Sequence, residues 1–277
     1  MSDYEQDLID AAWPYWECEA EIAKRFYAKA SDEDHIFYLR AQLWKELNPV
    51  DGFFNGLHKE LKDAVDMYPK VDREIDRHDY HFLLLQLVQE FNHYVVLADI
   101  FEHLMGRPIS PDDTVQLTEE KKLGDVRRAY VEQNDPLLNA AVGFTEGGGA
   151  RLFREGKELE GSKVNELTAK AMQTIFDDEH DHYMEQAKEA HSHIKSEEDL
   201  QRMKDAFQKN QRTTCLDAGR NVPGRHEQVR NREFYRSEPA LRKRSSRLFS
   251  NSFDFHHNTG ARKTAHEQQR RQRFNIA

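Results

Sequence analysis

The sequence predicts an all-α protein. Its periodic segments repeat apolar residues every three to four positions, which is the spacing of an amphipathic helix, and none alternates like a half-buried strand. Of the 277 residues, 38% are hydrophobic, so the chain can bury a substantial core. No stretch approaches the ~18 continuous apolar residues of a membrane span, and the acidic start lacks the basic region of a signal peptide. We therefore expect a cytoplasmic protein with no membrane partner.

Charge is distributed unevenly along the chain. From Gln201 onward there are 18 Lys and Arg against 7 Asp and Glu, whereas the net charge of the whole chain is −10. An acidic body with a basic C-terminal arm is expected, and the acidic body argues against nucleic-acid binding. The only two cysteines, Cys18 and Cys215, indicate neither a disulfide framework nor a thiolate metal site. Any metal would need oxygen and nitrogen ligands.

The order of helices follows from periodicity and from helix-breaking residues. Ser31 to Asp34 form a candidate N-cap cluster, Pro69 stops the third helix, and Gly106 ends a long helix that is apolar almost all round. All-round hydrophobicity predicts that this long helix is central and buried. The predicted helices cover residues 14–30, 31–47, 53–68, 73–105, 118–133, 139–156 and 163–194, with another after Ser196 and an irregular arm beyond Gly219. The helix over 139–156 is expected to be interrupted by Gly147-Gly148-Gly149.

Two of these helices carry a Glu-x-x-His pair on a core-facing stripe. Glu90 and His93 lie in the most apolar helix, and Glu179 and His182 follow Met172 and Ile175 on the same stripe. Positions i and i+3 share a helix face, so each pair would present a carboxylate and an imidazole together. Burying such groups is costly unless something pairs with them. A metal ion is one solution, and a metal-free buried Glu–His ion pair is the alternative.

Two more carboxylates have suitable positions. Glu146 lies 33 residues before Glu179, with the Gly161-Ser162 turn midway, so two antiparallel helices would bring them level. Glu60 lies 30 residues before Glu90 on an apolar stripe, although flanking lysines also suit a surface glutamate. Glu46, on the stripe of the second helix, is the fallback for Glu60.

This ligand set resembles that of the ferritin-like di-iron carboxylate proteins, in which two helices supply one Glu each and two supply Glu-x-x-His. The resemblance covers roughly residues 50 to 195. It implies a ferritin-like four-helix bundle over 50–195, extra N-terminal helices over 1–49, and a basic C-terminal helix and arm over 196–277. It also implies a site for two iron ions, with manganese as a substitute and O2 as co-substrate. The implied ligands are Glu60, Glu90, His93, Glu146, Glu179 and His182.

The resemblance assigns roles to these residues. Glu90 and Glu179 would bridge the metals, while Glu60 and Glu146 would be terminal. Asp178 stands where relatives place a carboxylate that hydrogen-bonds the facing imidazole, here His93, and Gln89 could serve His182 only as an amide.

The glycine run after Glu146 indicates either room for substrate or oxygen, or close helix contact. A radical-storing tyrosine four residues after His93 is absent, since Leu97 stands there. The expected substrate pocket comprises Leu87, Phe91, Phe144, Gly147, Gly148, Gly149 and Ile175.

The sequence thus leads to the hypothesis of a non-haem di-iron oxygenase or oxidase that hydroxylates, desaturates or N-oxygenates a small organic substrate. By resemblance, such an enzyme needs an external electron donor such as a ferredoxin, and a homodimer is compatible with it. Two alternatives stay open: a ferritin-like iron-storage protein without organic substrate, and a metal-free helical scaffold.

Overall fold

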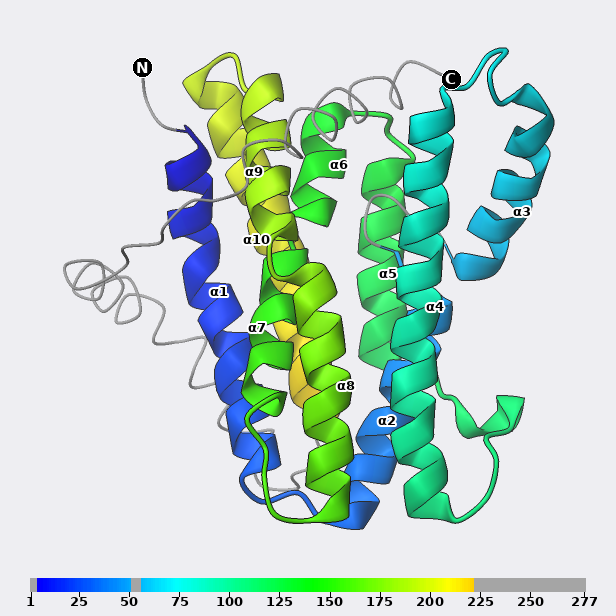
Figure 1. Ribbon diagram of the computed structural model, residues 1–277. Coiled ribbons are helices and arrows are strands. Elements are labelled where there is room, and N and C mark those ends of the chain that lie inside the picture. Colours follow the sequence, from blue (N-terminus) through cyan, green and yellow to red (C-terminus); the bar gives the residue numbers. More distant parts are fainter. Residues whose placement is uncertain (1–3, 51–55, 222–277) are drawn as a thin grey trace, which may run out of the picture.

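The computed structural model describes residues 4–50 and 56–221, and within these ranges the chain is helical with no β-strand (Figure 1). The outer part of the predicted arm, 222–277, lies outside the described residues. The α-helices are α1 (Tyr4–Tyr27), α2 (Asp32–Leu47), α3 (Leu57–Met67), α4 (Arg77–Met105), α5 (Thr118–Val131), α6 (Pro136–Gly143), α7 (Glu146–Gly156), α8 (Lys163–Glu179), α9 (His182–His193) and α10 (Glu197–Asn221).

Helix ends lie where the local sequence can satisfy the free backbone groups. Ser31 and Asp34 form a reciprocal capping box at the start of α2, as the N-cap cluster predicts. The Asp76 side chain accepts a hydrogen bond from the backbone of His78 at the start of α4. Gly106 ends α4 in the left-handed region, with φ 64°, a conformation that glycine adopts without steric cost. These caps set the length of α4, which carries Glu90 and His93.

The long helices pack side by side along most of the molecule (Figure 1). α4 contacts α2 on one side and α8 on another, α8 contacts α7, and α7 contacts α1. α10 then lies against α1, α5 and α6. One apolar cluster joins α1, α6, α9 and α10, and a second joins α1, α2, α4, α7 and α8. The candidate site lies among α2, α4, α7 and α8.

Two predicted helices are each broken once, and both breaks lie beside the site. The helix predicted over 139–156 is divided at Phe144-Thr145 into α6 and α7, and the helix predicted over 163–194 is divided at His180-Asp181 into α8 and α9. α6 contacts α9, and α7 contacts α8, so the two breaks occur at corresponding levels (Figure 1). The continuous helix predicted through Glu179 and His182 is therefore wrong.

The prediction that α4 is buried all round is also wrong. Leu84, Val88, Phe91 and Val95 are exposed on one side of it. α4 has neighbours on only part of its circumference, because α2, α3 and α8 leave one stripe uncovered within the described chain. Hydrophobicity alone gave no sign of which stripe that would be. No helix in the described ranges is long and apolar enough to cross a membrane.

Candidate metal centre

Carboxylate and imidazole side chains from separate helices gather in two groups. Within each group, three potential ligand atoms lie within 4.8 Å of one another. The first group comprises Glu46 of α2 with Glu90 and His93 of α4, and the second comprises Glu146 of α7, Glu179 of α8 and His182 of α9.

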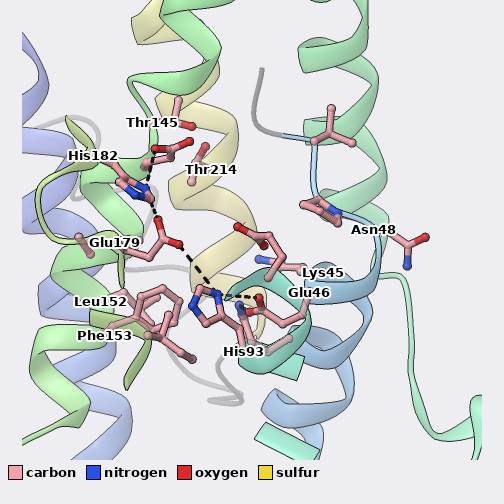
Figure 2. Close-up of a pocket in the computed structure, with 18 of the residues that line it drawn as sticks. Lys45, Glu46, Asn48, His93, Thr145, Leu152, Phe153, Glu179, His182 and Thr214 are labelled. Atoms are coloured by element: carbon pink, nitrogen blue, oxygen red, sulfur yellow. Dashed lines mark hydrogen bonds and ion pairs between the residues drawn. The ribbon is translucent and has the colours of Figure 1, made fainter. Parts of the chain in front are cut away.

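Glu179 lies between the two imidazoles. Its Oε2 atom is 2.8 Å from His182 Nδ1, and its Oε1 atom is 3.9 Å from His93 Nδ1 (Figure 2). Each oxygen of the carboxylate therefore faces a different group. The two groups form one site, joined by a single residue.

His93 is held from behind by a carboxylate. Its Nε2 atom is 3.0 Å from Asp178 Oδ2, and Asp178 Oδ1 accepts a hydrogen bond from Gln89 Nε2 at 3.0 Å. The other ring nitrogen, Nδ1, faces Glu46 at 3.8 Å and Glu179 at 3.9 Å. With its proton on Nε2, His93 donates to Asp178 and turns the lone pair of Nδ1 towards the site.

The helix breaks position the second group. Glu146 is the first residue of α7 and His182 is the first residue of α9, so both follow directly after a break. Glu146 Oε2 lies 3.4 Å from His182 Nδ1, and this buried oxygen has no hydrogen-bond partner of good geometry in the described chain. The breaks thus bring Glu146 and His182 to the level of Glu179.

Burial and charge act in opposite directions on the first group. Burial alone would lower the pKa of His93, but its hydrogen bond with Asp178 and the charges of Glu46 and Glu179 raise the pKa above its ordinary value. Burial raises the pKa of the Glu46 carboxyl, and His93 offsets part of that increase. The hydrogen bond with His93 holds the pKa of Asp178 below its usual range.

The second group is coupled more strongly. Burial works against the charge on His182, but Glu179 and Glu146 outweigh it and raise the pKa of His182 well above the ordinary value. Burial would raise the pKa of Glu179, yet His182 and His93 lower it overall. In this structure the imidazoles supply the positive charge that the buried carboxylates need.

A cavity of about 200 Å³ opens beside both groups. Its wall contains the six residues of the site together with further polar groups. Among the latter, Lys45 lies 3.4 Å from Glu120, and Arg127 donates to the backbone oxygen of Val50 at 2.8 Å and to Thr145 Oγ1 at 2.7 Å. The apolar part of the wall includes Tyr38, Ala150, Leu152, Phe153 and Ile175. Leu152 and Phe153 are labelled in Figure 2.

The structure brings five of the six predicted ligands together. The sixth, Glu60 on α3, lies outside both groups, with its Oε1 atom 3.5 Å from Lys59 Nζ. Glu46, the alternative to Glu60, lies beside Glu90 and His93 instead. α3 contacts α4 near Leu83 and Leu87, about two to three turns before His93, so Glu60 is displaced along α4 from the site. Because Glu46 lies on α2, the site extends beyond the 50–195 segment.

Only some of the residues predicted to surround the ligands lie where they were expected. Asp178 contacts His93 as expected, whereas Gln89 bonds Asp178 and not His182. Of the seven predicted pocket residues, only Gly149 and Ile175 line the cavity. Phe91 is exposed, because it lies two residues before His93 and therefore about 200° away around the helix. Leu87 packs against α3 and Phe144 against Trp16.

The glycine run serves mainly close helix contact. A Cβ atom added to Gly147 would lie 2.5 Å from the Trp16 ring, and one added to Gly148 would lie 2.0 Å from Glu19 Oε1. One added to Gly149 would be 3.7 Å from Phe153, an ordinary contact. Of the three glycines only Gly149 lines the cavity, while Gly147 and Gly148 allow α1 to approach α7.

Sequence reasoning missed several polar residues of the cavity wall, among them Glu19 and Arg127. Glu19 is buried on α1 and lines the cavity, and the Gln211 amide can donate to its Oε1 atom at 3.2 Å while accepting from Trp16 Nε1 at 3.1 Å. Its signal was present, because Glu19 interrupts the stripe formed by Ala12, Trp16 and Ala23. Arg127 had no comparable signal, since α5 carries seven charged residues and several of them face solvent.

Comparison of the chain with models of protein families, with curated proteins and with solved structures gave no match.

Proposed function

We propose that this chain binds two divalent metal ions, Fe(II) or Mn(II), and uses them with O2 to oxidise a small organic substrate. The observation that carries the proposal is the position of Glu179, with one carboxylate oxygen towards each of two carboxylate–imidazole groups. A carboxylate shared between two such groups suits a pair of ions, one held by each group.

The charges of the cavity support the presence of cations. Its wall carries the carboxyl groups of Glu19, Glu46, Glu90, Glu120, Glu146 and Glu179, but only two permanently cationic side chains, Lys45 and Arg127. With every carboxyl ionised and both imidazoles neutral, two divalent cations would neutralise the remaining negative charge. The Glu146 Oε2 atom, which has no hydrogen-bond partner of good geometry in the described chain, is a further group that a cation would satisfy.

The donor set favours iron or manganese over zinc. Four carboxylates and two imidazoles give mainly hard oxygen donors, and there is no thiolate, because Cys18 and Cys215 are not in either group. One ion would be held by Glu46, Glu90 and His93, and the other by Glu146, Glu179 and His182, with Glu179 shared. The ferritin-like arrangement that the ligand set resembles belongs to this proposal, with α2 in the place expected of α3.

When bound, a pair of redox-active ions would supply the electrons that activate O2. The chain's own residues have separate tasks. Asp178 fixes the orientation of His93, and Gln89 in turn fixes Asp178. Phe153, Ile175 and Leu152 restrict water on one side of the cavity, and its volume limits the substrate to a small molecule.

Anaerobic titration with Fe(II) tests the proposal. The full chain should bind two ions, and Glu179→Ala should lose both, because the residue is common to the two groups. Glu60→Ala is the matched control and should retain both ions, since Glu60 lies outside the groups. Admission of O2 should then oxidise two irons per chain. Failure to bind iron, or full occupancy in Glu179→Ala, would dismiss a di-metal site. Uptake of many irons per chain into a large shell would indicate storage and overturn the enzymatic proposal.

A further inference from the structure

The helical hairpin of α3 and α4 has an apolar face that nothing covers within the described chain. On α3 the face consists of Leu61, Val65 and Tyr68, and on α4 of Leu84, Val88, Phe91 and Val95. Three of these side chains are about as exposed as surface polar residues, with Val65 at 70%, Tyr68 at 69% and Val88 at 65%. We call these seven residues the hairpin face.

The two stripes lie on the same side of the hairpin. α3 and α4 run antiparallel (Figure 1), and Tyr80 of α4 donates to the backbone oxygen of Ala64 while its ring lies 6.2 Å from that of Tyr68. On α3 the exposed stripe lies next to the buried positions Leu57 and Ala64. It is rotated from them around the helix axis in the sense that leads from one residue to the next. The stripe on α4 is displaced in the same sense from Leu83 and Leu87. In an antiparallel pair this places both stripes on one side.

The spacing of the α4 stripe is that of a helix-pairing seam. Leu84, Val88, Phe91 and Val95 are separated by four, three and four residues, which places them at alternating d and a positions of two heptads. The β-branched residues fall at a and the larger ones at d, the distribution typical of two-stranded contacts. The side chains of such a seam insert between side chains of a facing apolar helix.

The charged side chains of the hairpin do not favour a charged protein as its partner. Between Phe82 and Ala98 the only acidic residue is Glu90, which belongs to the candidate metal centre on another side of α4. On α3, Lys59 and Lys62 are already paired with Asp63 and Asp66 at 3.0 and 2.5 Å. A partner must therefore offer an apolar helical surface of the same kind. The hairpin face itself is such a surface, and a two-fold axis would place it against its own copy.

We propose that two copies of this chain form a homodimer through the hairpin face. Seven side chains of this size, about half exposed, offer on the order of 600 Å² of apolar surface per chain, which approaches the ~800 Å² per partner of a standard interface. The basic segment 222–277 is the competing occupant from the same chain, but the hairpin face has no unpaired acidic group to attract it. The proposal does not depend on metal binding.

Sedimentation of the full chain with and without one added charge tests the dimer. The protein should sediment at twice the 32.6 kDa mass of one chain, and Val88→Glu should raise the dissociation constant at least tenfold while leaving the circular dichroism of a helical protein unchanged. Phe37→Glu is the matched control, since Phe37 is an exposed aromatic residue on α2, outside the hairpin face. A monomeric parent protein, or a Val88→Glu variant that dimerises as tightly as the parent, would overturn the proposal.

A crosslink identifies the occupant even if Val88→Glu does not fold. Val88→Cys can be labelled with a benzophenone maleimide, because both native cysteines are buried. Photolysis should give a covalent dimer with adducts on α3 or α4 of the second chain. A product of monomer mass with its adduct within 222–277 would show instead that the chain's own C-terminal segment covers the face.

Discussion

The Asp178 carboxylate lies 3.0 Å from the Nε2 atom of His93, on the side of the imidazole that faces away from the other carboxylates of the site. Asp178 and His93 are separated by 85 residues and lie on different helices. The contact fixes which ring nitrogen faces the site, so a change at Asp178 would affect metal binding without removing any proposed ligand.

We therefore expect Asp178→Asn to weaken metal binding by about 10- to 100-fold, the usual cost of losing a carboxylate that orients a metal-bound imidazole. An amide can accept from Nε2 but does not raise the basicity of the ring. Isothermal titration with Mn(II) would measure the change. Asp177→Asn is the control, because Asp177 is exposed and bonded to Gln173, and it should bind as the parent protein does. Equal affinities in the two variants would exclude the proposed role of Asp178.

A second pair of substitutions decides which glutamate completes the first group. Glu46→Gln should remove or weaken one of the two ions, because Glu46 Oε2 lies 3.8 Å from His93 Nδ1. Glu60→Gln should leave both ions in place. Metal content after dialysis would show the difference by elemental analysis. The reverse result, with Glu60→Gln losing an ion, would mean that α3 and not α2 supplies the ligand.

Neighbouring glycines of α7 should respond oppositely to alanine. Gly148→Ala should destabilise the fold by about 1 to 3 kcal/mol, because the new Cβ atom would lie 2.0 Å from buried Glu19 Oε1. Gly149→Ala should stabilise it by about 0.5 to 1 kcal/mol, because the helix interior favours alanine and the nearest atom is 3.7 Å away. Urea unfolding followed by circular dichroism would measure both. A neutral Gly148→Ala would show that α1 and α7 are not in such close contact.

Metal should stabilise the folded chain if the two groups are formed only in that state. With free Mn(II) at about 100 times its dissociation constant, the stabilisation should be about 2.7 kcal/mol per independent site. Differential scanning calorimetry with Mn(II) or with chelator would reveal it as a rise in Tm. The Glu179→Ala variant should show no such rise. A chelator-treated parent protein that melts at the temperature of the Mn(II)-loaded protein would favour a metal-free scaffold.

The sequence carried the all-helical class and most of the site, for identifiable reasons. Glu90 and His93 sit in a strongly apolar helix, where a polar pair is conspicuous, and the distance from Glu146 to Glu179 matches two helices around a Gly-Ser turn. Glu46 and Glu60 could not be separated in this way. Both lie on apolar stripes, and which stripe faces the site depends on how α2 and α3 pack against α4, a tertiary property.

The errors also have physical causes. The glycine run predicts an interruption at Gly147–Gly149, but these glycines lie within α7 and the break is at Phe144-Thr145. The break at His180-Asp181 contains no proline or glycine, so local propensity does not predict it. The exposed stripe of α4 has the sequence pattern of a core stripe, because apolar residues in a core and on an uncovered surface are alike in a single sequence. Most of the predicted pocket residues do not line the cavity for a related reason. A shift of one or two positions along a helix changes the direction of a side chain by 100° or 200°.

The break between α8 and α9 has a mechanical consequence. Glu179 ends one helix and His182 begins the next, so an ion held by both would span the joint and fix the angle between the two rods. α9 packs on α6, which is itself jointed to α7 just ahead of Glu146. An ion bound at the centre would therefore restrict the motion of α6 and α9 relative to α7 and α8.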